Sequence, residues 1–421
     1  MISKQNQKTT KELILDAAFS FLGRPNFATF SMNSLAEKVG ISKPAIYRHF
    51  KNKEALLDAM EELVIENLAE HLKDVASENF ETRKKSLASL IEYFSENPMH
   101  INYLIAQMSS NPNYEDRLFS KLYDRDLSFV REGDENVYLK KFRSDMARFS
   151  EHVFCGMSIF YFVTLRERCL SFGKIRGESK DFADKVVEII LGGLSGTTEG
   201  ESPFRPSPIS DERKRQLLEL CKIDSSAFPE ENRIFTALAS VIEKYKVTGV
   251  TVERIAAELQ MAKSSLYEYF DNKNEMIKCL INKELQLLKT IIIENTAEAK
   301  NFSEYVCILI ASEMEYFSHR ESIIPICGWL LMDGDGISEH EKYSREISAF
   351  PGNRRLPDRI DSPDLGFAYS PEYLIGWIKC LPVAFLCEAK GKSLSEGQRV
   401  EGIMRIIDCI LNGVGNKMEE K

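Results

Sequence analysis

The sequence has 421 residues, of which 43% are hydrophobic, and a formal net charge of −9. This length predicts two or more folded domains. No apolar stretch approaches the roughly 20 residues of a membrane-spanning helix, and the polar, basic N-terminus is unlike a secretion signal. Nine scattered cysteines, without a Cys-x-x-Cys pair, argue against a disulfide framework or a zinc site. We therefore expect a cytoplasmic protein without a cofactor.

The first sixty residues differ in charge from the rest of the chain. They carry nine basic and five acidic side chains, a net charge of +4. A basic region on an acidic protein can bind nucleic acid locally while phosphate repels the remainder. The N-terminal region is therefore the candidate for binding nucleic acid.

Local signals predict short helices at the start of the chain. Residues 10–22 place apolar side chains at the spacing of one buried helical face. Ser31 is a suitable N-cap for a helix over 32–39, and Gly40 is a suitable residue to end it.

A third and a fourth helix follow directly. Ser42 is expected to cap a helix that reaches about Phe50, and Asn52 to cap a long helix towards Lys73. A helix, a tight glycine turn and a second short helix are typical of a helix-turn-helix. We refer to this region as the first head.

Amphipathic helices without convincing strands are expected over 75–192, including helices over 152–171 and 179–194. A segment rich in Gly, Ser, Thr and Pro then predicts a linker. Farther on, residues 332–371 are rich in Gly, Pro and Asp and long for an internal loop. The sequence leaves open whether that segment is disordered or a lid.

The chain repeats itself at an offset of 220 residues. Residues 42–53, SKPAIYRHFKNK, recur as AKSSLYEYFDNK over 262–273. The same offset relates 186–193 to 406–413, near the end of each half. A repeat of this length is a duplicated domain pair and not the short period of a solenoid. The second helix-turn-helix region is called the second head.

A helix-turn-helix reads DNA by placing its second helix in the major groove. Ile46 and Phe50 fall on the face of that helix that packs against the head. Arg48 is suited to guanine, Pro44 and Ala45 to a thymine methyl group, and charged or hydroxyl groups to phosphates. The predicted DNA-binding residues are Ser31, Ser42, Lys43, Pro44, Ala45, Tyr47, Arg48, His49 and Lys53.

Residues 39–57, VGISKPAIYRHFKNKEALL, resemble the signature of the TetR family of bacterial repressors. The resemblance covers about sixty residues; the rest of each half is similar only in being helical and of suitable length. It implies an all-α regulator with a ligand-binding body, in which a small-molecule effector separates two DNA-reading heads. It also implies that the last two helices of each unit form a dimerising four-helix bundle.

The resemblance and the repeat together divide the chain into two tandem units. Each unit is expected to have a helix-turn-helix domain, at 8–68 and 228–288, followed by a helical regulatory body, at 69–195 and 289–415. A linker over 196–215 joins the units.

The second head departs from the first in turn, cap and charge. Gly40, Ser42, Arg48 and Lys51 are replaced by Gln260, Ala262, Glu268 and Asp271. Loss of the capping hydroxyl is expected to cost about 1 kcal/mol, and residues 221–280 have a net charge of −1. Two interpretations stay open, a weakened DNA-binding head and a mainly structural one. Its candidate DNA-binding residues are Thr251, Lys263, Ser264, Ser265, Tyr267 and Lys273.

Other patterns favour no further site. The histidines lack metal-ligand spacing, residues 333–336 lack the later ligands of a calcium loop, and no enzyme motif is present. Aromatic clusters are expected to be core rather than ligand cavity or dimer seam; they comprise Phe154, Phe160, Tyr161, Phe162, Tyr369, Tyr373, Trp377 and Phe385. We expect a non-enzymatic, nucleoid-associated protein.

The sequence thus predicts a tandem regulator of a double-stranded DNA operator. Helices over 152–171 and 179–194 are expected to meet those over 371–390 and 397–413, so that the two halves form an intramolecular pseudo-dimer. A homodimer of tandem chains is the alternative assembly. The alternative function is a helical scaffold that has lost DNA binding. Operator sequence, effector and direction of regulation are not encoded in any pattern of the sequence.

Overall fold

The computed structural model describes most of the chain. The described residues are 8–22, 31–74, 79–110, 114–125, 145–171, 178–197, 206–224, 232–245, 249–268, 270, 273–324, 326, 349–350, 354–355, 371–390 and 394–415. The chain forms two compact units, residues 1–138 and residues 139–421. The boundary between them lies within the first predicted repeat, and the second unit contains the last two helices of that repeat.

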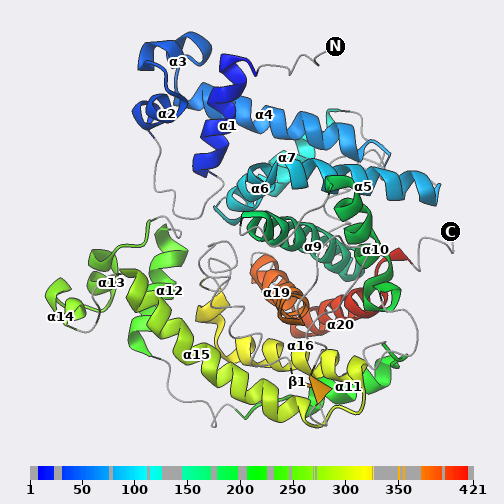
Figure 1. The fold of residues 1–421 in the computed structure, drawn as a ribbon. Helices are drawn as coiled ribbons and strands as arrows, with labels where there is room; N and C mark the ends of the chain where they lie inside the picture. The colour runs from blue at the N-terminus through cyan, green and yellow to red at the C-terminus, as the bar shows by residue number, and fades with distance from the viewer. Residues whose placement is uncertain are drawn as a thin grey trace. The chain divides into compact units, whose positions relative to one another are not determined.

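The first unit holds the first head and the start of its body (Figure 1). Helix α1 contacts α2, α4 and α6, and α2 contacts α3. The head is α1 (Thr10–Leu22), α2 (Met32–Val39), α3 (Lys43–His49) and the start of α4 (Lys53–Leu72); the body continues with α5 (Phe80–Glu96), α6 (Pro98–Ser110) and α7 (Tyr114–Tyr123).

A buried acid joins α4 to α7 in this unit. Glu61 is 5% exposed, and its carboxylate accepts bonds from Arg117 (2.6 Å) and Lys121 (2.5 Å) of α7. Two cations satisfy a carboxylate that burial would otherwise disfavour. The helix that begins at the head is thereby attached to the body.

The second unit is built around α16, which is buried along almost its whole length. Helix α16 contacts α11, α15, α19 and α20. The helices of the unit are α9 (Met146–Ser171), α10 (Ser179–Thr197), α11 (Asp211–Leu220), α12 (Arg233–Tyr245), α13 (Val252–Glu258), α14 (Lys263–Tyr267), α15 (Lys273–Thr296), α16 (Phe302–His319), the 3₁₀ turn η3 (Glu321–Ile323), α19 (Pro371–Lys390) and α20 (Glu396–Asn412).

The predicted all-α class is confirmed, with one small addition. Residues Ala349–Phe350 (β1) pair antiparallel with Arg354–Arg355 (β2) inside the Gly-, Pro- and Asp-rich segment. The rest of 332–371, apart from its last residue, and linker residues 198–205 lie outside the described residues. Helix α11 begins at Asp211, so the end of the predicted linker is helical. None of the described helices is long and apolar enough to cross a membrane.

Helices α9 and α10 pack against α19 and α20 (Figure 1). The ring of Trp377 lies 5.9 Å from that of Phe154 and 5.5 Å from that of Phe162, and its Nε1–H donates to Ser158 Oγ at 3.0 Å. Trp377 is fully buried. These rings are buried as a core would be, but they join α9 of the first repeat to α19 of the second, so at Trp377 the packing is also a seam between the repeats. The side chains of Tyr369 and Tyr373 lie outside the described residues.

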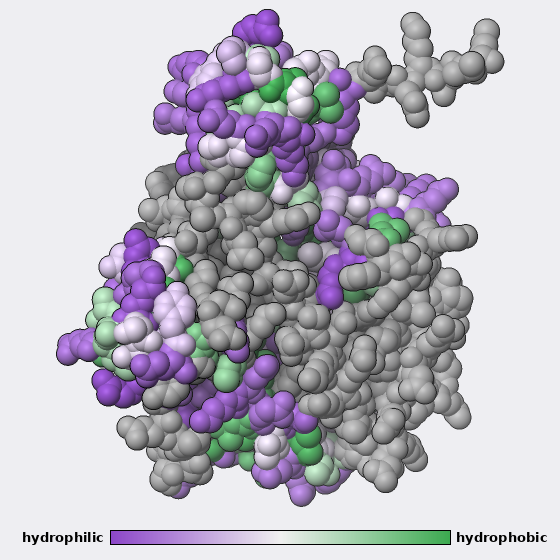
Figure 2. Space-filling model, turned by 60° about the vertical axis from the view of Figure 1, so that its left-hand side comes forward, coloured by the Kyte–Doolittle hydropathy of each residue, from purple (hydrophilic) through white to green (hydrophobic). Residues whose placement is uncertain are grey.

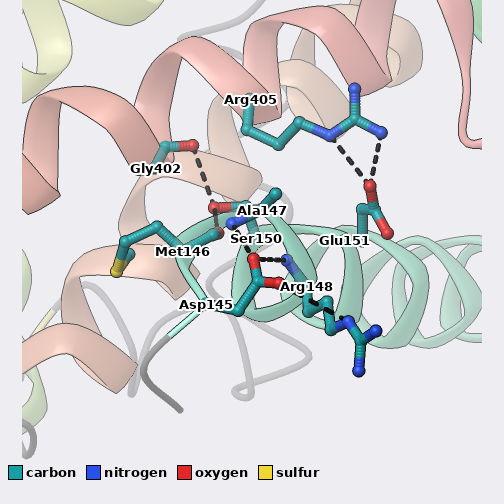
Figure 3. A network of polar contacts seen from close by, with 8 residues as sticks. All are labelled: Asp145, Met146, Ala147, Arg148, Ser150, Glu151, Gly402 and Arg405. Atoms are coloured by element: carbon teal, nitrogen blue, oxygen red, sulfur yellow. Dashed lines mark hydrogen bonds and ion pairs between the residues drawn. The ribbon is translucent and has the colours of Figure 1, made fainter. Parts of the chain in front are cut away.

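Polar contacts also cross between α9 and α20 (Figure 3). The Ser150 hydroxyl donates to the Gly402 carbonyl at 3.0 Å, and the Arg405 guanidinium binds the Glu151 carboxylate. Gly402 is required by close packing, because a Cβ there would lie 2.3 Å from the Phe385 ring. These contacts hold α9 and α20 close together.

Two glycines related by the repeat meet where α10 is kinked, at Gly193, and where α20 ends, at Gly413. Gly193 (φ 56°, ψ −154°) and Gly413 (φ 70°, ψ −171°) adopt a backbone region that essentially only glycine occupies. A Cβ on Gly193 would lie 2.5 Å from the Gly413 nitrogen. Nearby, Val414 N–H donates to the Ile190 carbonyl at 3.0 Å. The two backbones can approach so closely because neither residue has a side chain.

Candidate nucleic-acid interface

The first head has the local geometry expected from its caps. Ser31 Oγ accepts from Ser34 N–H (3.1 Å), and Ser34 Oγ accepts from Ser31 N–H (3.0 Å), which closes a reciprocal capping box at the start of α2. Gly40 (φ 75°) ends α2 in the left-handed region, and Ile41 N–H donates to the Ala36 carbonyl. This turn directs the chain into α3.

Helix α3 has one buried and one exposed face. Ile46 is fully buried and Phe50 is 3% exposed, so both anchor the helix on the head. The rest of the helix is outward-facing: Ala45 is half-buried, and the exposed side chains are Lys43, Pro44, Tyr47, Arg48 and His49. Hydrophilic residues cover most of the first head's described surface (Figure 2). The exposed face therefore combines cations, a phenol and small apolar groups, the groups that bind phosphates and base edges.

The remaining predicted residues of the first head lie at helix starts. Lys53 is half-buried at the first position of α4, and the Asn52 side chain accepts from Ala55 N–H at 2.8 Å. The hydroxyl of Ser31 is used in the capping box. Their contacts with DNA stay predictions.

One expectation about the caps is wrong. Ser42 lies at the N-cap of α3, but its side chain makes no capping hydrogen bond, and Ala262 occupies the same position of α14 with nearly the same backbone angles. Replacing serine by alanine at this position therefore loses no bond within the head, and the expected cost of about 1 kcal/mol does not arise.

The second head preserves the turn of the first without its glycine, although α14 ends two residues earlier than α3 does. Gln260 has φ 55° where Gly40 has φ 75°, and Met261 N–H donates to the Ala256 carbonyl just as Ile41 does to Ala36. Thr251 caps α13 by accepting from Arg254 N–H. The hydrogen bonds of the turn are thus retained although a side chain is held in the left-handed region.

The outward face of the second head differs in charge. Leu266 is buried where Ile46 is buried, whereas Lys263, Ser264, Tyr267 and Glu268 are exposed and Ser265 is half-buried. The Lys263 ammonium binds the Glu253 carboxylate of α13. This hydrogen bond raises the pKa of Lys263 and lowers that of Glu253. The Lys273 side chain lies outside the described residues.

Two residues of consequence were not among those predicted from the sequence. Glu61 was not predicted because its charge gives no sign of burial. Only its position on the apolar face of the helix indicates that the side chain is buried. Glu253 was absent because its partner lies ten positions away in the next helix. A comparison with Asn33, the equivalent residue at the 220-residue offset, would have shown that the second head carries an additional acid at Glu253.

Comparisons with known proteins agree with both heads. The family described as bacterial regulatory proteins, tetR family, matches residues 14–60 and again residues 234–280. The class D tetracycline repressor protein of Escherichia coli is 41% identical over 64 residues, which cover 15% of this chain and 28% of that protein. The class H tetracycline repressor protein of Photobacterium damsela subsp. piscicida matches to the same extent.

A longer and weaker similarity extends beyond the head. An HTH-type transcriptional regulator of Staphylococcus aureus (strain USA300) is 23% identical over 146 residues, 34% of this chain and 78% of that protein. The chain thus spans just over a quarter of the length of the tetracycline repressors it matches, and more of the staphylococcal regulator. The first family match includes residues 31–53, where DNA-contacting residues were predicted.

Proposed function

We propose that the chain, in which two segments match the TetR family of bacterial regulatory proteins, is a transcriptional regulator that reads double-stranded DNA mainly through residues 31–50. The observation that carries the proposal is the exposed face of α3. Lys43, Arg48 and His49 point away from a head that is held by Ile46 and Phe50. A rigid short helix with exposed cations is what entry into a major groove requires.

Repression, with release by a small-molecule effector, is the finer form of this proposal. It rests on the resemblance, because the tetracycline relatives are named as repressors. The contact of Glu61 with Arg117 and Lys121 supports it, since a change in the body around α7 would be transmitted to α4, which begins in the head. The effector itself is unidentified.

The pseudo-dimer is the second finer form. In a two-fold interface, a residue that touches its own equivalent lies near the axis. Gly193 and Gly413 are equivalent at the 220-residue offset, and their backbones are in contact. This supports a pairing of the two halves within one chain, and heads that differ would favour an asymmetric operator.

Light scattering coupled to size exclusion tests the pairing. One chain of 48.1 kDa is the expected stable species. A stable species of two chains over a wide concentration range would argue for the homodimer of tandem chains instead.

DNA binding is tested by fluorescence anisotropy with genomic fragments selected by the purified protein. Lys43→Ala should weaken binding and reduce the slope of log K against log salt by about 0.9, the effect of one lost phosphate contact. Arg48→Ala should weaken binding by about 1–3 kcal/mol if it reads a base. Lys263→Ala should change little. Equal losses at Lys43 and Lys263 would refute a dominant first head, and salt-independent or absent retention of the wild type on DNA would favour the scaffold.

A further inference from the structure

Lys43 and Lys263 have the same place in the two heads. Each is the first residue of its helix, α3 or α14, and each follows an N-cap in extended conformation. The Lys43 ammonium lies 5.9 Å from the Tyr47 ring centroid, and that of Lys263 lies 5.5 Å from the Tyr267 ring centroid. The two lysines therefore present the same group over the same kind of ring.

Among the acidic differences between the heads, one lies in direct contact with the lysine. Glu253, in the first turn of α13, bonds the Lys263 ammonium. The equivalent position in the first head is Asn33, an exposed residue without charge. Within the described part of the first head, no carboxylate forms an ion pair with Lys43. One substitution between the repeats thus distinguishes a free ammonium from a paired one.

We propose that Glu253 blocks the second head by competing intramolecularly with DNA phosphate for Lys263. To contact a phosphate, Lys263 has to leave the carboxylate, and the released carboxylate then repels that phosphate. Both costs are absent at Lys43. This inference rests on the proposed DNA-binding function and names Glu253 as one residue that makes the two heads unequal.

The size of the effect follows from the exposure of the pair. The Lys263 and Glu253 side chains are 48% and 57% exposed, so their attraction is weak and screened by salt. Repulsion of phosphate by the same exposed carboxylate is screened in the same way, so the two contributions are both modest. The effect should be clear at low salt and fade as salt increases.

The experiment exchanges the two residues in the full chain. Glu253→Asn should tighten binding to a mixed-sequence DNA duplex roughly three- to tenfold at low salt, and steepen the salt slope by up to about 0.9. Asn33→Glu should do the opposite to the first head. Both positions lie in the first turn of a helix, where an acid is tolerated, and the Thr251 cap remains. Circular dichroism checks that each variant is folded.

The control is Glu258→Gln, which changes the charge of the same head equally. Glu258 binds Lys244 and Ser240, and in the described part of the second head it forms no hydrogen bond or ion pair with Lys263. It should tighten binding less than Glu253→Asn. Lys263→Ala should cost several-fold in the Glu253→Asn background, although it changes little in the wild type.

The outcomes separate this inference from the proposed function. If Lys43→Ala weakens binding but Glu253→Asn behaves like Glu258→Gln, the block is absent and the regulator stands. If Lys263→Ala has the same effect in both backgrounds, the inference is likewise overturned. If no variant and no wild-type protein binds DNA, the proposed function fails first.

Discussion

The two heads show that the backbone of a turn can be kept while the charge of the exposed face beside it changes. Gly40 and Gln260 both have a positive φ after equivalent helices, and Ile41 and Met261 donate to equivalent carbonyls, so the turn is kept whether or not the residue is suited to it. The exposed faces, by contrast, differ where Arg48 becomes Glu268 and Asn33 becomes Glu253. Backbone geometry is maintained by bonds and burial inside the head, whereas surface charge has no such support. The backbone of the turn therefore persists after duplication, while the charge of the exposed face is free to change.

The largest expected effect is on thermal stability, at the contact between Gly193 and Gly413, where the two repeats have the same residue. Gly413→Ala would put a Cβ 2.2 Å from the Leu191 carbonyl oxygen at φ 70°. We expect a loss of about 3 kcal/mol or more, which corresponds to a melting temperature roughly 6–12 °C lower. Gly193→Ala should cause a similar loss, and differential scanning fluorimetry measures both.

Gly156→Ala in α9 is the matched control for these variants. A Cβ there meets nothing within 4 Å, and alanine is favoured over glycine inside a helix. It should raise stability slightly. Unchanged melting of Gly413→Ala would contradict the close crossing of α10 and α20.

An intermediate effect concerns Glu313, a buried acid whose equivalent position in the first repeat is apolar. Glu313 and Lys379 are 2% and 3% exposed, with Nζ and Oε1 3.9 Å apart. When α5 and α16 are aligned on their caps, Asn79 and Asn301, the position of Glu313 corresponds to Ile91. Burial raises the pKa of Glu313 to about 8, and the Lys379 charge opposes this only in part.

The sign of the pH dependence follows from that shift. Between about pH 4.5 and 8 the folded chain holds a proton that the unfolded chain has lost, so this group makes stability fall as the pH rises, by at most about 1.4 kcal/mol per pH unit. Glu313→Gln should flatten the decline in melting temperature between pH 5 and 8. Exposed Glu298→Gln is the control, and parallel curves for wild type and Glu313→Gln would contradict the buried acid.

The smallest expected effect is on stability, in the turn of the second head. Gln260→Gly removes a side chain from the left-handed region and should stabilise the chain by about 0.5–1 kcal/mol, after the greater freedom of glycine in the unfolded state is subtracted. Gly40→Gln should lose a similar amount. Thermal melting of both variants measures the exchange. A destabilised Gln260→Gly would show that the glutamine side chain contributes more than its backbone strain.

Local features of the fold were predictable and contacts between helices were less so. The bounds of α2 follow from Ser31 and Gly40 because caps act over three or four residues. The failed Ser42 cap shows the limit of this, since residue type does not decide whether a hydroxyl points at its amide. The pair of Glu253 and Lys263 depends on how two helices are spaced. The contact of Gly193 with Gly413 joins positions 220 residues apart, so the repeat revealed their equivalence but not their contact.

The indole of Trp377 determines which of the two repeats can pair with each other. Its buried N–H has an acceptor in Ser158, and the repeat-equivalent residues are Met157 and Ile378. Two second repeats paired in the same way would place the indole against Ile378, which has no acceptor, at a cost of about 1–3 kcal/mol for the unmet donor. Two first repeats would have no indole at all. A mixture of separated halves should therefore sort into unlike pairs, each with one basic head and one acidic head.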